Sequence, residues 1–143
     1  MVAPSGQQAE AENRTLIEVR IAASAAQISA VRVVAADLAA RQDYDLDAIS
    51  DLRMAVDEAC ATLVPLAAPG SMLSCQFLVG AGTIDVVVTV PVMQPAHVPE
   101  HTFGWQVLST LTDEVRTIAH GGEDGQPLVV GIELCVRRDR IDG

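Results

Sequence analysis

Two alternating segments joined by a short glycine loop are the feature that most limits the folds open to this chain. In residues 71–79 and 83–90, apolar and polar side chains alternate, which is typical of β-strands with one buried face. The linking sequence Gly80-Ala81-Gly82 is short enough for a hairpin, so the two strands are expected to pair antiparallel. Their predicted inward side chains are Leu73, Cys75, Phe77, Val79, Ile84, Val86, Val88 and Val90.

Two helical segments precede this hairpin. Apolar residues recur every three or four positions in residues 24–41, and again between the polar joint 42–47 and Pro65. This spacing is typical of helices that bury one stripe, and Pro65 is expected to end the second helix. The predicted stripes are Ile28, Val31, Ala35 and Leu38 in the first helix, and Ile49, Leu52, Val56, Ala59 and Leu63 in the second.

The remaining segments complete the order of elements. Alternation predicts strands over residues 15–21, 114–119 and 128–137, and a helix over 103–113 follows a proline-rich irregular loop at 91–101. This order lacks the regular strand–helix alternation that builds a parallel doubly wound sheet. We therefore predict an α/β sandwich of two layers, in which helices cover one face of a mostly antiparallel sheet. The inward side chains of the third helix are expected to be Phe103, Val107, Leu108 and Leu111.

The length of the chain, 143 residues, suits a single domain with one core. We expect a disordered leader at residues 1–13, the domain at 14–138 and a polar tail at 139–143. No apolar run approaches the roughly 20 residues that span a bilayer, and the leader has neither the basic start nor the apolar stretch of a signal peptide. A cytoplasmic protein with no membrane partner is therefore predicted.

The charge of the chain limits its partners. The net charge is −10, and every basic residue is an arginine. Such a surface repels phosphates, so nucleic acid is not expected as a partner. The excess of acid has two interpretations, because it can keep the protein soluble or attract a basic protein partner.

Neither the cysteines nor the histidines form a pattern typical of a metal site. Cys60, Cys75 and Cys135 stand singly among apolar residues and are expected to be buried as small hydrophobic side chains. His97 and His101 are four residues apart, but the prolines around them disfavour the helix that would bring them together. We interpret both histidines as loop residues and predict no metal site.

Residues 51–62 carry the motif that is most informative about function. Their sequence, Asp-Leu-Arg-Met-Ala-Val-Asp-Glu-Ala-Cys-Ala-Thr, resembles the N box "A-V-x-E-A-x-x-N" of the histidine-kinase-like ATPase superfamily. The DLR-x-AVDE core is similar to the mycobacterial-type anti-sigma-F branch, and a second similarity runs from residues 104–108 to Asp-Glu-Val at 113–115. The resemblance spans roughly residues 16–136. It is to the RsbW-type family of anti-sigma factors and serine-protein kinases, which implies the Bergerat fold.

The resemblance implies roles for three residues of a nucleotide site. Glu58 takes the position of the glutamate that orients water or a hydroxyl for phosphoryl transfer, and Thr62 replaces the asparagine that holds Mg²⁺. Gly104 is the glycine that survives from the phosphate-binding Gly-x-Gly, at residues 102–104. From the residues alone, the row of side chains that contains Glu58 is a solvated helix face.

Other positions depart from the family pattern. Residues 90–94 (Val-Pro-Val-Met-Gln) replace Asp-x-Gly-x-Gly, whose aspartate binds adenine, and Val129-Val130 replaces Gly-Thr. We therefore predict a degenerate nucleotide site with no firm cofactor, and ATP or ADP with Mg²⁺ as the alternative. The loop at 91–101 is expected to be mobile or to pack over this site. Phe103 and Trp105 are expected to pack as core and lid residues, with contact to a protein partner as the alternative.

The same resemblance implies a protein-binding function. Arg32 matches the first-helix arginine with which the family contacts a sigma factor, whereas without the family it is a surface arginine. A guanidinium suits a bidentate bond to a partner carboxylate, and Arg20 is a second candidate for partner binding. We predict an anti-sigma factor that sequesters an alternative sigma factor of the general stress, F-type class. A STAS-type anti-anti-sigma protein is expected to release it by partner switching.

Two other functions remain open. The first is an ATP-dependent serine kinase that phosphorylates the anti-anti-sigma protein, with Glu58 as the catalytic residue. The second is an α/β scaffold with an unrelated protein partner. The resemblance also implies a homodimer, with the first strand and the first helix at its interface.

Overall fold

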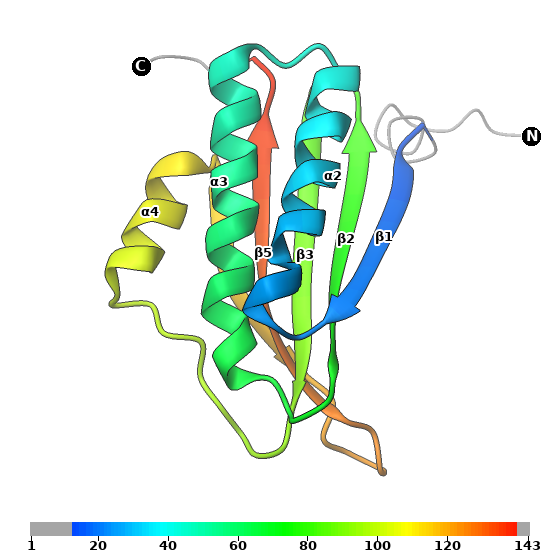
Figure 1. Ribbon diagram of the computed structural model, residues 1–143, viewed down its shortest axis with the longest axis vertical. Helices are drawn as coiled ribbons and strands as arrows, with labels where there is room; N and C mark the ends of the chain where they lie inside the picture. Colours follow the sequence, from blue (N-terminus) through cyan, green and yellow to red (C-terminus); the bar gives the residue numbers. More distant parts are fainter. Residues whose placement is uncertain (1–12, 140–143) are drawn as a thin grey trace, which may run out of the picture.

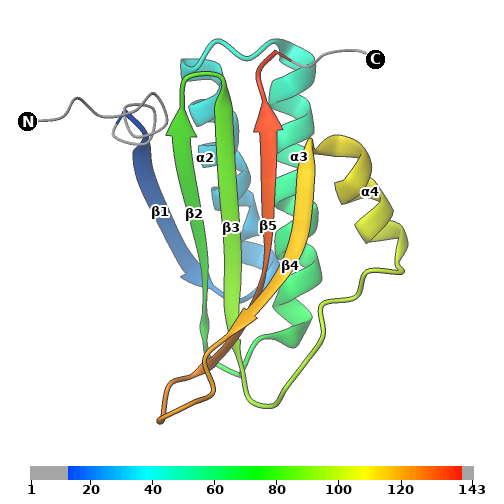
Figure 2. The same cartoon turned by 180° about the vertical axis from the view of Figure 1, so that it is seen from behind.

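Within residues 13–139, five strands form one antiparallel sheet, and the helices lie on one of its faces (Figures 1 and 2). The structure is a computed structural model that describes residues 13–139. Residues 1–12 of the predicted leader and residues 140–143 of the predicted tail lie outside the described residues. The predicted domain boundaries therefore stay a prediction.

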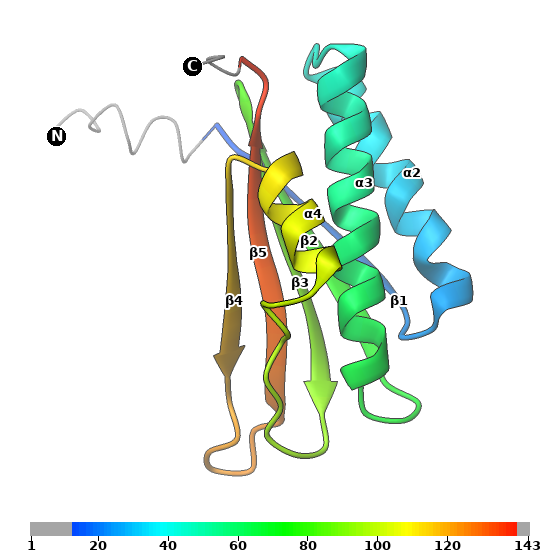
Figure 3. The ribbon, with the colours of Figure 1, turned by 90° about the vertical axis from the view of Figure 1, so that its left-hand side faces the viewer.

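The order of elements is the one expected from the sequence. Two short 3₁₀ turns, η1 and η2, flank the first two helices, and the strands lie in the order β1-β2-β3-β5-β4 with each neighbouring pair antiparallel. Seen from the side, the helices and the sheet form two layers (Figure 3), which confirms the predicted α/β sandwich. The elements are β1 (Thr15–Ala22), η1 (Ala25–Gln27), α2 (Ile28–Arg41), α3 (Leu46–Leu63), η2 (Val64–Leu66), β2 (Met72–Gly80), β3 (Thr83–Val92), α4 (Phe103–Leu111), β4 (Glu114–His120) and β5 (Leu128–Arg137).

The central hairpin forms as its alternation predicts. Gly80 pairs with Thr83, so the loop between β2 and β3 is the two-residue turn Ala81-Gly82. Gly82 adopts a φ of 82°, a left-handed conformation that costs glycine little and other residues more. The inward side chains of both strands are buried, and they form the centre of the sheet's contact with the helices.

The second helix is bounded by local chemistry at both ends. The Asp45 side chain accepts a hydrogen bond of 2.8 Å from the backbone N–H of Ala48, a typical N-cap, and the helix begins at Leu46. At the other end the α-helix stops at Leu63, and Pro65 lies in the 3₁₀ turn that follows. The predicted stripe packs on the sheet, except that Ile49 is only half-buried.

The three cysteines lie in the apolar interior, as predicted. Cys60 and Cys75 are completely buried and Cys135 is nearly so, and all three thiols are free. Burial raises the pKa of Cys60 and of Cys135 to about 12, because a thiolate is poorly solvated there. These thiols therefore remain neutral packing groups.

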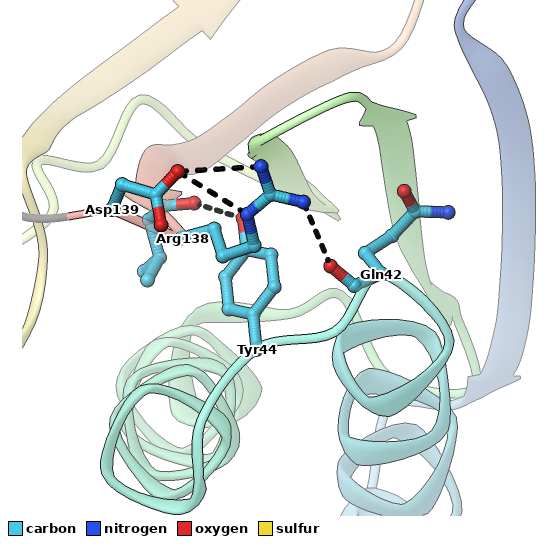
Figure 4. Close-up of polar contacts among 5 residues, drawn as sticks. Gln42, Tyr44, Arg138 and Asp139 are labelled. Atoms are coloured by element: carbon cyan, nitrogen blue, oxygen red, sulfur yellow. Dashed lines mark hydrogen bonds and ion pairs between the residues drawn. The ribbon is translucent and has the colours of Figure 1, made fainter.

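A buried tyrosine fastens the turn between α2 and α3 to the end of β5 (Figure 4). The hydroxyl of Tyr44 donates a hydrogen bond of 2.6 Å to the carbonyl of Val136. Beside it, Arg138 donates to the Gln42 carbonyl at 3.4 Å. Burial also raises the pKa of Tyr44, so the phenol stays protonated as a donor. Sequence reasoning treated residues 42–47 as a polar joint and missed this anchor.

One expectation about the segment after β3 is wrong, and the expectation that the loop is mobile or packs over the nucleotide site stays a prediction. Strand β3 continues to Val92, two residues into the predicted loop, because Pro91 and Val92 pair with Val129 and Leu128 of β5. The rest of that loop is anchored by Val98, which is buried against the core.

The third helix differs from the prediction in its orientation. It ends at Leu111, and Leu108 alone is fully buried on it. Phe103 was expected to face inward, but it is 80% exposed, since α4 lies beside α3 at the margin of the helical layer. Trp105 packs against the core from a half-buried position, as expected.

Candidate functional site

A cleft opens between the helices on the outer side of the helical layer. Figure 1 shows α3 between α2 and α4, and the cleft lies over this central helix. Its volume is about 420 Å³. The cleft is lined by Arg32, Arg53, Met54, Asp57, Glu58 and Val107. We call these residues the helical cleft.

An ion pair between α2 and α3 lies at the centre of the helical cleft. Arg32 donates two hydrogen bonds to Oδ1 of Asp57, of 3.0 Å from Nε and 2.7 Å from Nη2. Both side chains are about two-fifths exposed, so solvent screens the pair and its contribution to stability is small, roughly 0–1 kcal/mol. The arginine predicted to contact a partner is therefore accessible but already holds a carboxylate of its own chain.

Arg53 is a cleft residue that sequence reasoning missed. It lies four residues before Asp57 on α3, which is the spacing at which side chains of a helix normally pair. Asp57 is bound to Arg32 instead, and Arg53 is the one arginine in the described range 13–139 with no carboxylate partner. Local spacing would have assigned the aspartate to the wrong arginine, because the pairing is decided between two helices.

Glu58 and Gly104, two of the residues that the resemblance assigns to a nucleotide site, lie next to each other. A Cβ added to Gly104 would overlap Oε1 of Glu58, so the carboxylate lies directly against the first turn of α4. That turn is capped by Thr102, whose hydroxyl accepts a hydrogen bond of 3.1 Å from the backbone N–H of Trp105. The start of a helix favours negative charge, so Glu58 lies in a favourable position for a carboxylate. Thr62 is half-buried one turn further along α3 and does not line the cleft.

The two strand segments that depart from the family pattern lie opposite each other. Val90 pairs with Val130, and Pro91 pairs with Val129. The side chains of Val90 and Val130 are buried in the core, and Val92 is nearly buried beside them. This strand end, which we define as Val90, Val92, Val129 and Val130, therefore has no polar side chain to hydrogen-bond an adenine base.

Arg20 lies apart from the helical cleft. It is on β1, the edge strand of the sheet, where its exposed side chain approaches Glu18 at 3.8 Å. It does not line the cleft that contains Arg32. The structure therefore does not unite the two arginines that were predicted to bind a partner.

An apolar groove adjoins the helical cleft. Met54 and Val107 line both hollows, and the groove continues along α4 with a volume of about 330 Å³. Phe103 and Met54 are both exposed, and both line this groove. The lining residues are Met54, Phe103, Gln106, Val107, Thr110 and Leu111. We call this the α3–α4 groove.

Residues 13–139 contain neither a metal-binding cluster nor a membrane-spanning helix. That range contains no group of three or more His, Cys, Asp or Glu residues that could hold a metal ion, and His97 and His101 are both exposed. None of the helices in the same range is long and apolar enough to cross a bilayer.

The fold and the α3 motif together define a histidine kinase-like ATPase domain, and the family model of that domain matches residues 21–131. The anti-sigma-F factor RsbW of Mycobacterium tuberculosis is 34% identical over 125 residues, which cover 85% of this chain and 73% of that protein. The serine-protein kinase RsbW of Bacillus subtilis is 28% identical over 151 residues, covering 91% of each chain. The serine-protein kinase RsbW of Bacillus pumilus is 26% identical over 154 residues, covering 92% of each chain. The chain belongs to the RsbW group of the histidine kinase-like ATPase family, which confirms the resemblance noted at residues 51–62.

Proposed function

We propose that this protein is an anti-sigma factor that sequesters an alternative sigma factor of the general stress, F-type class. The observation that carries the proposal is the contrast between a strand end filled with valines and an exposed, charged cleft around Arg32. The valines at the strand end disfavour nucleotide binding, and the charged cleft suits recognition of a protein partner. Arg32 is the proposed contact for the sigma factor, because its guanidinium can exchange Asp57 for a partner carboxylate.

Release by a STAS-type anti-anti-sigma protein is part of the same proposal. The two partners would compete for overlapping surfaces that include Arg32, with Arg20 as a second candidate contact. The relatives' names support this assignment, since they include both an anti-sigma factor and serine-protein kinases. We place the protein in the cytoplasm, where sigma factors act.

The test is a binding titration with the alternative sigma factors encoded in the same genome, each purified. We expect one of them to bind, and Arg32→Glu to weaken that binding several-fold while the thermal unfolding midpoint stays within about 2 °C of wild type. Arg41→Glu on the same helix is the matched control, because Arg41 is exposed and paired only with Asp37. Failure of every sigma factor to bind the wild-type protein would refute the proposal.

The second candidate function is a serine kinase that phosphorylates the anti-anti-sigma protein. The contact between Glu58 and the first turn of α4 favours the kinase function. In the family pattern, Glu58 takes the position of the catalytic glutamate and Gly104 that of a phosphate-binding glycine. The strand end does not fit an adenine base, so we derive no reaction step through ATP. Incubation with labelled ATP, Mg²⁺ and a STAS protein tests this function. Transfer of label that is lost in Glu58→Ala would establish the kinase.

We also propose a homodimer formed through β1 and α2. Strand β1 pairs with β2 on one side only, and Leu16 on this strand is largely exposed. An open strand edge is a natural place for a second chain to pair. Light scattering after gel filtration tests the mass, and Leu16→Lys should shift a dimer toward monomer.

A further inference from the structure

Arg53 is a cation in a strongly acidic protein, yet no carboxylate of the described chain binds it. The net charge is −10, and every other arginine within residues 13–139 has a carboxylate partner. Its natural helical partner, Asp57, is held by Arg32 at 2.7 Å. Arg32 and Arg53 therefore compete for a single aspartate, and one of them is left without a partner.

Glu58, the other carboxylate of the helical cleft, does not supply the missing partner for Arg53. Glu58 lies against Gly104 at the start of α4, where the helix terminus already favours its negative charge. Asp57 is neutralised by Arg32. An incoming acidic side chain would consequently meet one unsatisfied guanidinium, whereas an incoming basic side chain would have to displace an existing contact.

Apolar surface lies directly beside this guanidinium. Met54, the residue after Arg53, lines both the helical cleft and the α3–α4 groove, and Phe103 and Val107 continue the groove along α4. Phe103 is 80% exposed at the helix start, a position that gives it no role in the core. Aromatic residues, methionine and arginine are all enriched at protein interfaces, and arginine is frequent among the residues that contribute most to binding.

We propose that the α3–α4 groove binds a segment of the sigma factor that carries an acidic residue next to a large apolar one. The acidic residue binds Arg53, and the apolar residue packs on Met54 and Phe103. This inference rests on the proposed anti-sigma function and extends it from Arg32 on α2 to a second anchor on α3 and α4. Asp57 links the two anchors, since it can pair with either arginine while a partner carboxylate binds the other.

The experiment is a binding titration of the sigma factor that binds the wild-type protein, using four single variants. Arg53→Glu and Phe103→Ala should each weaken binding about tenfold or more. Arg41→Glu and Leu46→Ala are the matched controls, because they change an exposed arginine on α2 and an exposed apolar residue on α3 outside both hollows. Both controls should stay within about twofold of wild type.

The salt dependence of binding gives a second readout. Loss of an ion pair at Arg53 should make binding of Arg53→Ala less sensitive to salt than binding of the wild type. Thermal unfolding of each variant shows whether it is folded. Because the side chains of Arg53 and Phe103 are both exposed, we expect unfolding midpoints within about 2 °C of wild type.

The outcomes separate this inference from the proposed function. If the wild type binds a sigma factor and both Arg53→Glu and Phe103→Ala bind equally well, the groove proposal is overturned and the anti-sigma function stands. If these variants lose only binding of the STAS protein, or only self-association, the groove binds that protein or a second copy of this chain instead of the sigma factor. The proposal is then likewise overturned. If the wild type binds no sigma factor, the proposed function itself fails.

Discussion

The strand end and the helical cleft belong to the same domain but are built in opposite ways. At the strand end, Val90 and Val130 are buried and paired across two central strands. In the helical cleft, Arg32 and Asp57 are partly exposed, and their pairing contributes little to stability. Stability is therefore concentrated at the strand end, whereas the cleft can change its partners without unfolding the chain.

Helix α3 carries both kinds of environment on its two sides. Cys60 faces the sheet and is completely buried, while Asp57 and Glu58 line the cleft. A single helix therefore joins the packed interior to the surface proposed for recognition. Substitutions on its two sides should have different consequences, and the predictions that follow test this contrast.

The largest effect is expected from Val90→Asp, which restores the acidic residue of the family pattern at the strand end. It would bury a carboxylate among valines with no partner, at a cost of about 3 kcal/mol or more in the free energy of unfolding. The loss should shrink at acidic pH, because a neutral carboxyl is easier to bury. Urea unfolding measures it. Ser74→Asp, on β2 opposite Arg20, is the control and should be nearly neutral.

A smaller loss is expected from Gly131→Ala in β5. A Cβ at this position would overlap the backbone carbonyl of Val88 and crowd the side chain of Thr89. Backbone of a central strand cannot move aside easily, so we expect a loss of about 2–3 kcal/mol. An unchanged unfolding midpoint would show that the strand end is looser than its packing indicates.

The buried thiols predict how stability depends on pH. Burial, with the charge of Asp57 as a second cause, raises the pKa of Cys60 from 9.0 to about 12. The folded state therefore keeps the proton more tightly than the unfolded state, and this contribution to stability is lost as pH rises from about 9 toward 12. Between pH 8 and pH 10 the free energy of unfolding should fall by about 1 kcal/mol for this thiol. Urea unfolding of wild type and Cys60→Ala at both pH values should show a smaller fall in the variant.

In the helical cleft, Asp57→Asn should change the free energy of unfolding by only about 0.5 kcal/mol, because the lost ion pair is exposed to solvent. Its effect on binding should be larger than its effect on stability. Without the aspartate charge, both Arg32 and Arg53 are available to partner carboxylates, so we expect the sigma factor to bind about two- to fivefold more tightly. Weaker binding would mean that Asp57 itself contacts the partner.

A similarly small effect on stability is expected from Gly104→Ala. The added Cβ meets only the end of the Glu58 side chain, which can rotate away, and alanine favours a helix by up to about 1 kcal/mol over glycine. The two terms oppose each other, so the unfolding midpoint should shift by no more than about 3 °C. A large loss would show that the position of Glu58 matters for folding, in contrast to the rest of the cleft.

Much of the fold was predictable because its signals are local. Alternation in residues 71–79 and 83–90 was sufficient to predict the hairpin, and the apolar stripes of the first two helices were nearly correct. The motif at residues 51–62, together with the order of elements and the Asp-Glu-Val segment at 113–115, was sufficient to predict the family. Phe103 was misplaced because helical spacing shows which residues share a face of a helix, but not where that helix lies relative to its neighbours.

The candidate site was less predictable, because it is formed by contacts between separate helices. The contact of Glu58 with Gly104 and the pairing of Arg32 with Asp57 each join residues that are far apart in the chain. The shortage of carboxylates at Arg53 follows from that pairing. The four-residue spacing of Arg53 and Asp57 on the same helix would instead predict that these two residues pair.

By itself, the sequence determined the order of strands and helices and the apolar character of the sheet's inner face, because each depends on residues a few positions apart. Only the tertiary structure decided which arginine holds Asp57, that Phe103 faces solvent, and that Val90 and Val130 lie side by side. These features arise where separate elements meet. Their energies depend on distances in space that no local pattern of residues encodes.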